Sequence, residues 1–205
     1  DGEHAEVCEA LREQYLPRFA GDALPATNTG MAVAIADRLD TIAGIYATGQ
    51  KPTGTRDPFG LRRAALGLLR TSIERKLDLD LQSLIAQALA ALPFAAPENC
   101  ARDVYDYVIE RLRAYYVEGD AGFTVTTEMF DAVLATRPAS PLDFDARLRA
   151  LVEFLRLPEA QALAAANKRI ANILRKATEP VGDRIDANRL VDPAEQILGE
   201  QVEAI

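Results

Sequence analysis

The stretch PEAQALAAANKRIANILRK, residues 158–176, decides how the rest of the chain is interpreted. Pro158 suits the first turn of a helix, where its missing amide hydrogen has no partner to lose. Apolar residues then recur at positions 163, 166, 170, 173, 174 and 177, which predicts one apolar face turned toward a core. A second face carries a polar stripe spaced four residues apart, with two arginines beside it: Lys168, Asn172 and Lys176, then Arg169 and Arg175.

The same helical pattern extends over most of the sequence. The chain has 205 residues, 49% of them hydrophobic, which is enough for one or two globular cores. Ala, Leu, Arg and Glu are abundant, aromatic residues are few, and no strand pattern of any length is present. We therefore predict an all-α fold, in which a helical bundle follows a smaller helical unit.

Several features of the sequence indicate the cellular setting. No apolar run is long enough to cross a bilayer, and no signal-peptide pattern opens the chain. The two cysteines, Cys8 and Cys100, are far apart and form no CxxC motif. We expect a reduced, cytoplasmic protein with no membrane partner. Because the sequence begins without Met inside a helical pattern, we also expect it to be part of a longer protein.

Turn and cap residues divide the chain into helices. PFAAPEN, residues 93–99, is the predicted border between a unit at 1–92 and a unit at 97–205. One uninterrupted helix is expected over 100–118, closed by a glycine. The predicted helix-starting residues are Asn28 or Thr29, Asp57, Asp80, Ser140 and Asp192. In the apolar helix over 31–46, Asp37 and Asp40 are expected to pair with Arg38 or with neighbouring arginines.

The charge is unevenly distributed. The net charge is −8, yet residues 48–76 and 146–176 each contain seven Lys or Arg and two Asp or Glu. Two basic segments in an acidic chain are compatible with a nucleic-acid-binding patch. Basic residues on amphipathic helices are, however, more often ordinary solvated faces. Two tyrosine pairs, Tyr105/Tyr107 and Tyr115/Tyr116, could stack on bases, although such residues more often pack in or beside a core.

Several motifs of metal-dependent and nucleophilic catalysis are missing from the sequence. His4 is the single histidine, so zinc and iron sites built from His and Cys are excluded within these residues. The missing histidines also argue against a metal-dependent phosphohydrolase. No GxSxG motif is present, and KPTGTRDPFG, residues 51–60, is not a phosphate-binding P-loop. We therefore predict no catalytic and no metal-binding residue in this chain.

Longer stretches of the sequence resemble a known family. AANKRIANILRK, preceded by FDAVLATRP and DFDARLRALVEFL, is similar to the helical anticodon-binding domain named for its Asp-Ala-Leu-Arg motif. With REQYLPRFAGDALP and VAIADRLDTIAGIYATGQKPTGTRDPFGLRRAALGLLR, the resemblance narrows to the C-terminal part of the β subunit of bacterial tetrameric glycyl-tRNA synthetase. It covers nearly the whole chain.

The resemblance implies a function. The family joins glycine to tRNA(Gly) with ATP, the α subunit performs the adenylate chemistry, and the β subunit holds the tRNA. Residues 1–92 would then form the C-terminal end of the preceding helical body, next to a degenerate HD-like region. Residues 97–205 would form the anticodon-binding domain. The fragment itself would hold no cofactor. The positions carried over as RNA-facing are Lys168, Arg169, Asn172 and Lys176, with Arg147 and Arg111 in addition. The alternative is a helical module that docks a partner subunit without touching RNA.

Overall fold

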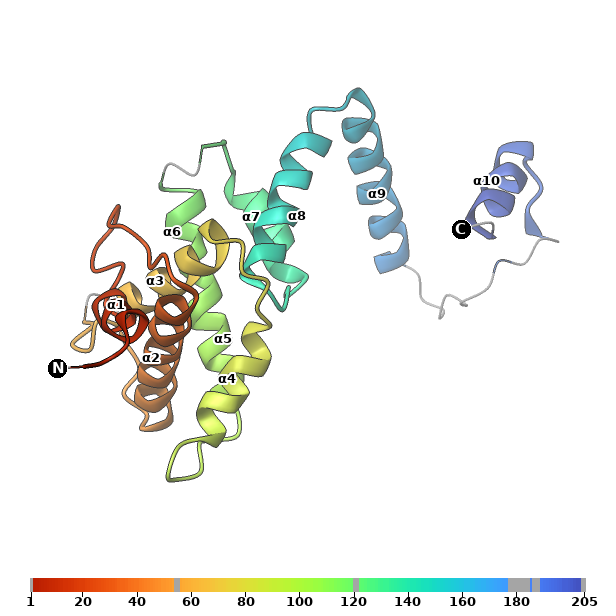
Figure 1. The fold of residues 1–205 in the computed structure, drawn as a ribbon. Helices are drawn as coiled ribbons and strands as arrows, with labels where there is room; N and C mark the ends of the chain where they lie inside the picture. The colour runs from red at the N-terminus through yellow and green to blue at the C-terminus, as the bar shows by residue number, and fades with distance from the viewer. Residues whose placement is uncertain (1, 54–55, 120–121, 177–184, 186–188, 204–205) are drawn as a thin grey trace. The chain divides into compact units, whose positions relative to one another are not determined.

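A computed structural model of the chain describes residues 2–53, 56–119, 122–176, 185 and 189–203 (Figure 1). Within these ranges the regular elements are helices, and no strand is formed. The all-α prediction is therefore confirmed. The helices are α1 Ala5–Glu13, α2 Asn28–Ala47, α3 Leu61–Glu74, α4 Leu81–Ala90, α5 Cys100–Glu110, α6 Leu112–Tyr116, α7 Thr127–Ala135, α8 Pro141–Phe154, α9 Pro158–Lys176 and α10 Pro193–Glu203. None of the described helices is both long and apolar enough to span a bilayer.

The chain divides into two compact units, Asp1–Phe154 and Leu155–Ile205, which are described separately. In the first unit, α2 packs against α1, α3, α4 and α5, and α3 also contacts α8. One hydrophobic cluster holds side chains from both sides of residues 93–99, including Ile42, Leu68 and Phe144. Contacts across 93–99 thus join the helices into one core, whereas the sequence pattern placed a border there. The division into family domains at 1–92 and 97–205 stays a prediction.

The core forms where apolar residues recur at helical spacing. Leu61, Ala65 and Leu68 lie on one face of α3 and are at most 1% exposed. Burying a leucine or isoleucine side chain contributes about 1.5–3 kcal/mol to stability, so a helix face of this kind fixes how the helix packs. Phe130 of α7 and Phe144 of α8 are fully buried, and their ring centroids lie 5.2 Å apart.

The helix starts follow the predicted chemistry, with two corrections. Asp80 caps α4 as predicted, because its carboxylate accepts the amide of Ser83 at 2.9 Å. At α2 the capping residue is Thr27, whose hydroxyl accepts the amide of Gly30 at 3.0 Å, and not Asn28 or Thr29. Asp57 does accept amides of α3. However, α3 begins only at Leu61, after Gly60 in the left-handed conformation.

The helix predicted over 100–118 is interrupted. At Arg111 the amide bonds to the carbonyl of Val108 at 3.0 Å, three residues back instead of four. This tighter turn separates α5 from α6. The hydrophobic spacing continues through it, since Ile109 and Leu112 are both buried. Periodicity alone therefore could not locate the break.

Arg38 is buried in α2, and its partners differ from the prediction. Its guanidinium donates hydrogen bonds to five backbone carbonyls, those of Gln14, Tyr15, Leu16, Pro17 and Ala34, at 2.8–3.3 Å. Asp37 and Asp40 are exposed and form no ion pair with Arg38. The expected carboxylate pairing was therefore wrong. The charge is instead stabilised by carbonyl dipoles at the end of α1, where a cation is favoured.

Residues 14–27 form the connector between α1 and α2, and Glu13 binds the end of this connector that precedes α2. Its side chain is buried, and its carboxylate accepts the amides of Ala26 and Thr27 at 2.8 and 3.0 Å and the Thr27 hydroxyl at 2.6 Å. Burial raises the pKa of Glu13, but these hydrogen bonds outweigh it and lower the pKa below the ordinary value. Gly30 leaves room for this carboxylate, because a Cβ there would collide with it.

Candidate nucleic-acid interface

Helix α9 presents two different faces. At 3.6 residues per turn, the Lys168–Asn172–Lys176 stripe lies about 150° around the helix from the mean direction of its apolar residues. All three side chains of the stripe are exposed. Together with Arg169, they line a shallow hollow on the helix. The structure therefore brings four of the six predicted RNA-facing residues to one surface.

The charges of this surface are available. In the described part of the chain, Lys168, Arg169 and Lys176 form no ion pair with a carboxylate. Arg175 donates a hydrogen bond to the side-chain oxygen of Asn172 at 3.1 Å. The amide nitrogen of Asn172 remains exposed and can donate. Three cations and one oriented amide are suited to phosphates and to the edge of a base.

The apolar face of α9 was expected to turn toward a core, and the described residues do not cover it. Leu163 is 58% exposed, Ile170 54% and Ile173 60%. The described part of this unit consists mainly of α9 and α10, which is too little chain to enclose a hydrophobic core. The expectation of an inward-facing apolar side was therefore wrong for the described residues.

The other two predicted positions lie in the Asp1–Phe154 unit. Arg147, on α8, pairs with Asp143 at 2.9 Å on the surface. Arg111 lies over the ring of Tyr107, with its guanidinium carbon 5.0 Å from the ring centroid. Burial, with Asp57 nearby, raises the pKa of Tyr107 to about 12. Arg111 is thus engaged in packing, whereas Arg147 is held in a surface ion pair.

The tyrosine pairs are divided between packing and a surface hollow. Tyr105 is buried and donates to the carbonyl of Pro138 at 2.7 Å. Tyr116 is buried and donates to Asp145 at 2.6 Å, and Arg149 bonds the other oxygen of that carboxylate. Packing thus accounts for these two tyrosines. Tyr115 is partly exposed and lines a hollow that the sequence did not predict.

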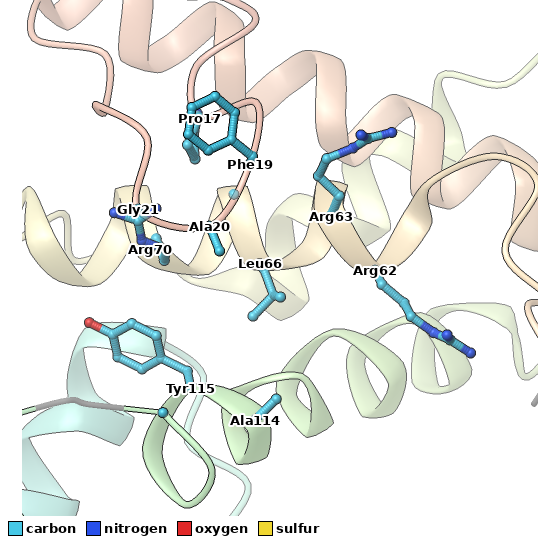
Figure 2. A pocket seen from close by; sticks show the side chains of 12 residues that line it. Pro17, Phe19, Ala20, Gly21, Arg62, Arg63, Leu66, Arg70, Ala114 and Tyr115 are labelled. Carbon is cyan, nitrogen blue, oxygen red and sulfur yellow. The ribbon is translucent and has the colours of Figure 1, made fainter. Parts of the chain in front are cut away.

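This hollow, of about 500 Å³, lies between the α1–α2 connector, α3 and α6 (Figure 2). Figure 2 shows Phe19 on one side of α3 and Tyr115 on the other, with Leu66 between them. Among the described residues, the charged side chains that line it are three arginines of α3, with no carboxylate: Arg62, Arg63 and Arg70. The spacing of these arginines was visible in the sequence. The position of Phe19 depends on the path of the connector, which cannot be predicted from the spacing of apolar residues.

A metal site is not evident in the described residues. No group of three or more His, Cys, Asp or Glu side chains there is arranged to hold a metal ion. Asp57 serves α3, since its two carboxylate oxygens accept the amides of Leu61 and Arg62 at 2.8 and 2.9 Å. The segment at residues 57–60 thus starts a helix.

Known proteins are similar to this chain over nearly its whole length. The family described as glycyl-tRNA synthetase beta subunit matches residues 1–135. The glycine–tRNA ligase beta subunit of Marinobacter nauticus is 51% identical over 204 residues, 99% of this chain. Those of Cronobacter sakazakii and Salmonella schwarzengrund are 51% and 52% identical over 98% and 95% of it.

The chain is much shorter than these relatives. It spans 29% of the length of the first two and 28% of the third. The family match includes the 51–60 loop and α3, the segment on which the sequence resemblance was most specific. The chain therefore belongs to the glycyl-tRNA synthetase beta subunit family.

Proposed function

We propose that this chain is a tRNA-binding part of a glycine–tRNA ligase beta subunit and that α9 contacts the anticodon end of tRNA(Gly). The observation that carries the proposal is the exposed surface of Lys168, Arg169, Asn172 and Lys176, on which three cations have no carboxylate partner in the described residues. Family membership supports it, because the relatives are named as ligases of glycine and tRNA.

The mechanism is electrostatic capture followed by base contacts. The cations attract the phosphates of the stem and loop, which gives affinity without sequence preference. The Asn172 amide, oriented by Arg175, then offers a hydrogen bond to an unstacked base of the loop. Arg147 adds a cation if its ion pair with Asp143 opens. We assign no RNA contact to Arg111, because its guanidinium is engaged with Tyr107.

In this proposal the chain positions tRNA and performs no chemistry. The alpha subunit of the ligase would form the glycyl adenylate from ATP, and this chain would hold no cofactor. We infer a cytoplasmic location, where tRNA is charged. We expect no glycylation of tRNA by the purified chain, measured with labelled glycine and ATP. Glycylation by the chain without an added alpha subunit would contradict this division of roles.

A salt titration tests the α9 surface. Each phosphate contact on a single strand contributes a slope of about 0.7 in log affinity against log salt. We expect Lys168→Ala with Lys176→Ala to reduce the slope by about 1.4 and to weaken binding about tenfold at ~0.15 M salt. The measurement is fluorescence anisotropy with a labelled anticodon stem-loop of tRNA(Gly). An unchanged slope would contradict the proposal.

A matched control removes two positive charges elsewhere. Arg12→Ala with Arg102→Ala changes the net charge equally, on two exposed arginines of α1 and α5. This variant should retain the slope of the unaltered chain. Asn172→Ala should keep the slope but reduce discrimination between stem-loops with glycine and unrelated anticodons. Equal weakening by both double variants would mean that only overall charge matters.

The exposed apolar face of α9 supports a second candidate function, docking onto a partner subunit. Leu163 and Ile170 form an exposed apolar surface on the side away from the lysines, and Ile173 lies at its edge, where it also lines the hollow of Lys168 and Lys176. Leu163→Gln with Ile170→Gln, which leaves the net charge unchanged, should abolish co-purification with the alpha subunit if docking is the function of α9, and leave stem-loop binding intact. Lys168→Ala with Lys176→Ala should weaken stem-loop binding and leave co-purification with the alpha subunit unchanged. The two candidates are thus separable on one helix.

A further inference from the structure

The hollow bordered by Phe19, α3 and Tyr115 contains no residue of α9. Its lining combines apolar, aromatic and arginine side chains, which are the residue types that bind nucleotides. Its volume of about 500 Å³ falls within the range of small-molecule pockets. Its floor is apolar, with Leu66 at the centre (Figure 2). Phe19 is 60% exposed although it is a large aromatic residue, and because the guanidinium carbon of Arg18 lies over its ring at 5.7 Å from the centroid, the opposite face is the one available for stacking. Stacking surfaces of this kind accept any base.

The arginines of α3 are the charged groups that can bind a phosphate at this hollow. Arg63, on the first turn of α3, is exposed and has no hydrogen bond or ion pair among the described residues. Arg70 is bound to Glu74 through Nε at 2.7 Å, and its buried Nη1 atom has no described partner. No carboxylate is among the described lining residues, although Glu74 pairs with Arg70 beside the hollow, so the charges of the lining itself favour an anion. An apolar floor, an open ring and a guanidinium without a partner together match a base joined to a phosphate.

We propose that this hollow binds one unstacked nucleotide of a single-stranded RNA, with the base on Phe19 and Leu66 and the phosphate at Arg63. The Asp1–Phe154 unit thus has an RNA contact of its own. The proposal does not depend on the α9 surface, because none of the lining residues belongs to α9. Stacking supplies affinity without base identity, so the site holds a strand and does not select its sequence.

Nuclear magnetic resonance can locate the ligand, because the chain is only 22.3 kDa. Three glycines line the hollow, and the amides of two of them, Gly21 on the connector and Gly67 on α3, are the chosen reporters. A single-stranded RNA hexamer should shift both signals, whereas the same sequence as a duplex should not. Guanosine 5′-monophosphate should shift them more strongly than guanosine or inorganic phosphate. A shift by the mononucleotide without one by the hexamer would overturn the proposal.

Variants then assign the contacts. Phe19→Ala should weaken hexamer binding about tenfold. Arg63→Gln should weaken it about fourfold and lower the salt slope by about 0.7. Phe19 and Arg63 are exposed, so both variants should fold. Phe94→Ala and Arg102→Gln, at an exposed phenylalanine and an exposed arginine outside the hollow, are the controls and should change neither value.

Two further outcomes decide between alternatives. The Lys168→Ala, Lys176→Ala variant should retain the glycine shifts, so loss of α9 binding and loss of this site are distinguishable. If an acidic peptide shifts Gly21 and Gly67 while the hexamer does not, the hollow is a protein-binding site and the proposal is wrong. If the hexamer shifts other amides and leaves these two unchanged, RNA binds elsewhere and the proposal is also wrong.

Discussion

Replacing Arg38 by alanine should destabilise the Asp1–Phe154 unit by about 3–5 kcal/mol, the largest effect expected for any single change in the chain. The guanidinium satisfies five backbone carbonyls, four of them in residues 14–17, directly after α1. Buried carbonyls that lose their donor retain the full desolvation penalty. For a domain of this size, the loss corresponds to a lower melting temperature by about 6–20 °C in calorimetry.

The matched control is Asp37→Ala. Asp37 is the exposed neighbour that the sequence suggested as the partner of Arg38, and its charge does favour the protonated guanidinium. Because it forms no ion pair with Arg38, its removal should change stability by less than about 0.5 kcal/mol. If Asp37→Ala proved as harmful as Arg38→Ala, the carboxylate would be the true partner.

Gly67 gives an independent test of the same contact. A Cβ at this position would lie 2.6 Å from Nε of Arg38, so Gly67→Ala must displace the guanidinium. We expect the substitution to destabilise the unaltered chain but to be tolerated beside Arg38→Ala. A double-mutant cycle measures this coupling directly. Additive effects of the two changes would contradict the close approach.

Gly30→Ala should destabilise the same unit by about 2–4 kcal/mol. A Cβ at residue 30 would collide with the carboxylate of Glu13 and would lie 2.8 Å from the Thr27 hydroxyl. The Thr27 hydroxyl would be displaced from its capping position, and Glu13 would be driven from its hydrogen bonds to Ala26 and Thr27. Chemical denaturation followed by far-ultraviolet circular dichroism measures the effect.

Gly44→Ala in the same helix is the control. A Cβ at Gly44 would meet only Leu92, at 3.9 Å, which is an ordinary contact. Alanine is favoured over glycine in a helix by about 1 kcal/mol, so this variant should be unchanged or stabilised. Equal losses at the two glycines would indicate a general intolerance of α2 to change, and would remove the special role of Glu13.

The pH dependence of stability isolates Glu13 itself. Its folded-state pKa lies below its ordinary value, so the unfolded chain takes up the proton first. Its contribution to stability is complete above the ordinary pKa of a glutamate and is lost as the pH falls through the lowered folded-state pKa. Glu13→Gln should therefore flatten the acid limb of the stability profile. An unchanged acid limb would assign acid sensitivity to other carboxylates.

Much of the fold was predictable because helix periodicity and cap chemistry are local. The spacing of apolar residues located α2, α3 and α9, and Asp80 marked the start of α4. What failed was tertiary. The carbonyl partners of Arg38 come from a connector more than twenty residues away in sequence. Within the Asp1–Phe154 unit, the helices before and after residues 93–99 share one core, and this too depends on packing between elements that are distant in sequence.

The candidate site shows the same division. Residues spaced four apart on α9 had to share a face, so the Lys168–Asn172–Lys176 stripe followed from the sequence. No pattern indicated that Arg111 would stack on Tyr107 or that Phe19 would border a hollow with Arg63. These placements depend on where a turn or a connector runs. Spacing predicts neighbours within one helix and says little about neighbours between elements.

The connector that carries Phe19 is fastened at both ends and in the middle. Arg38 binds the carbonyls of residues 14–17, Glu13 binds the amides of Ala26 and Thr27, and Asp22 accepts the amide of Arg18 at 2.8 Å. Rigidity of this kind is established during folding. Binding to a preorganised wall costs less conformational entropy than binding that must order a loose segment, so Arg38 and Glu13 would strengthen binding at the hollow although neither side chain lines it.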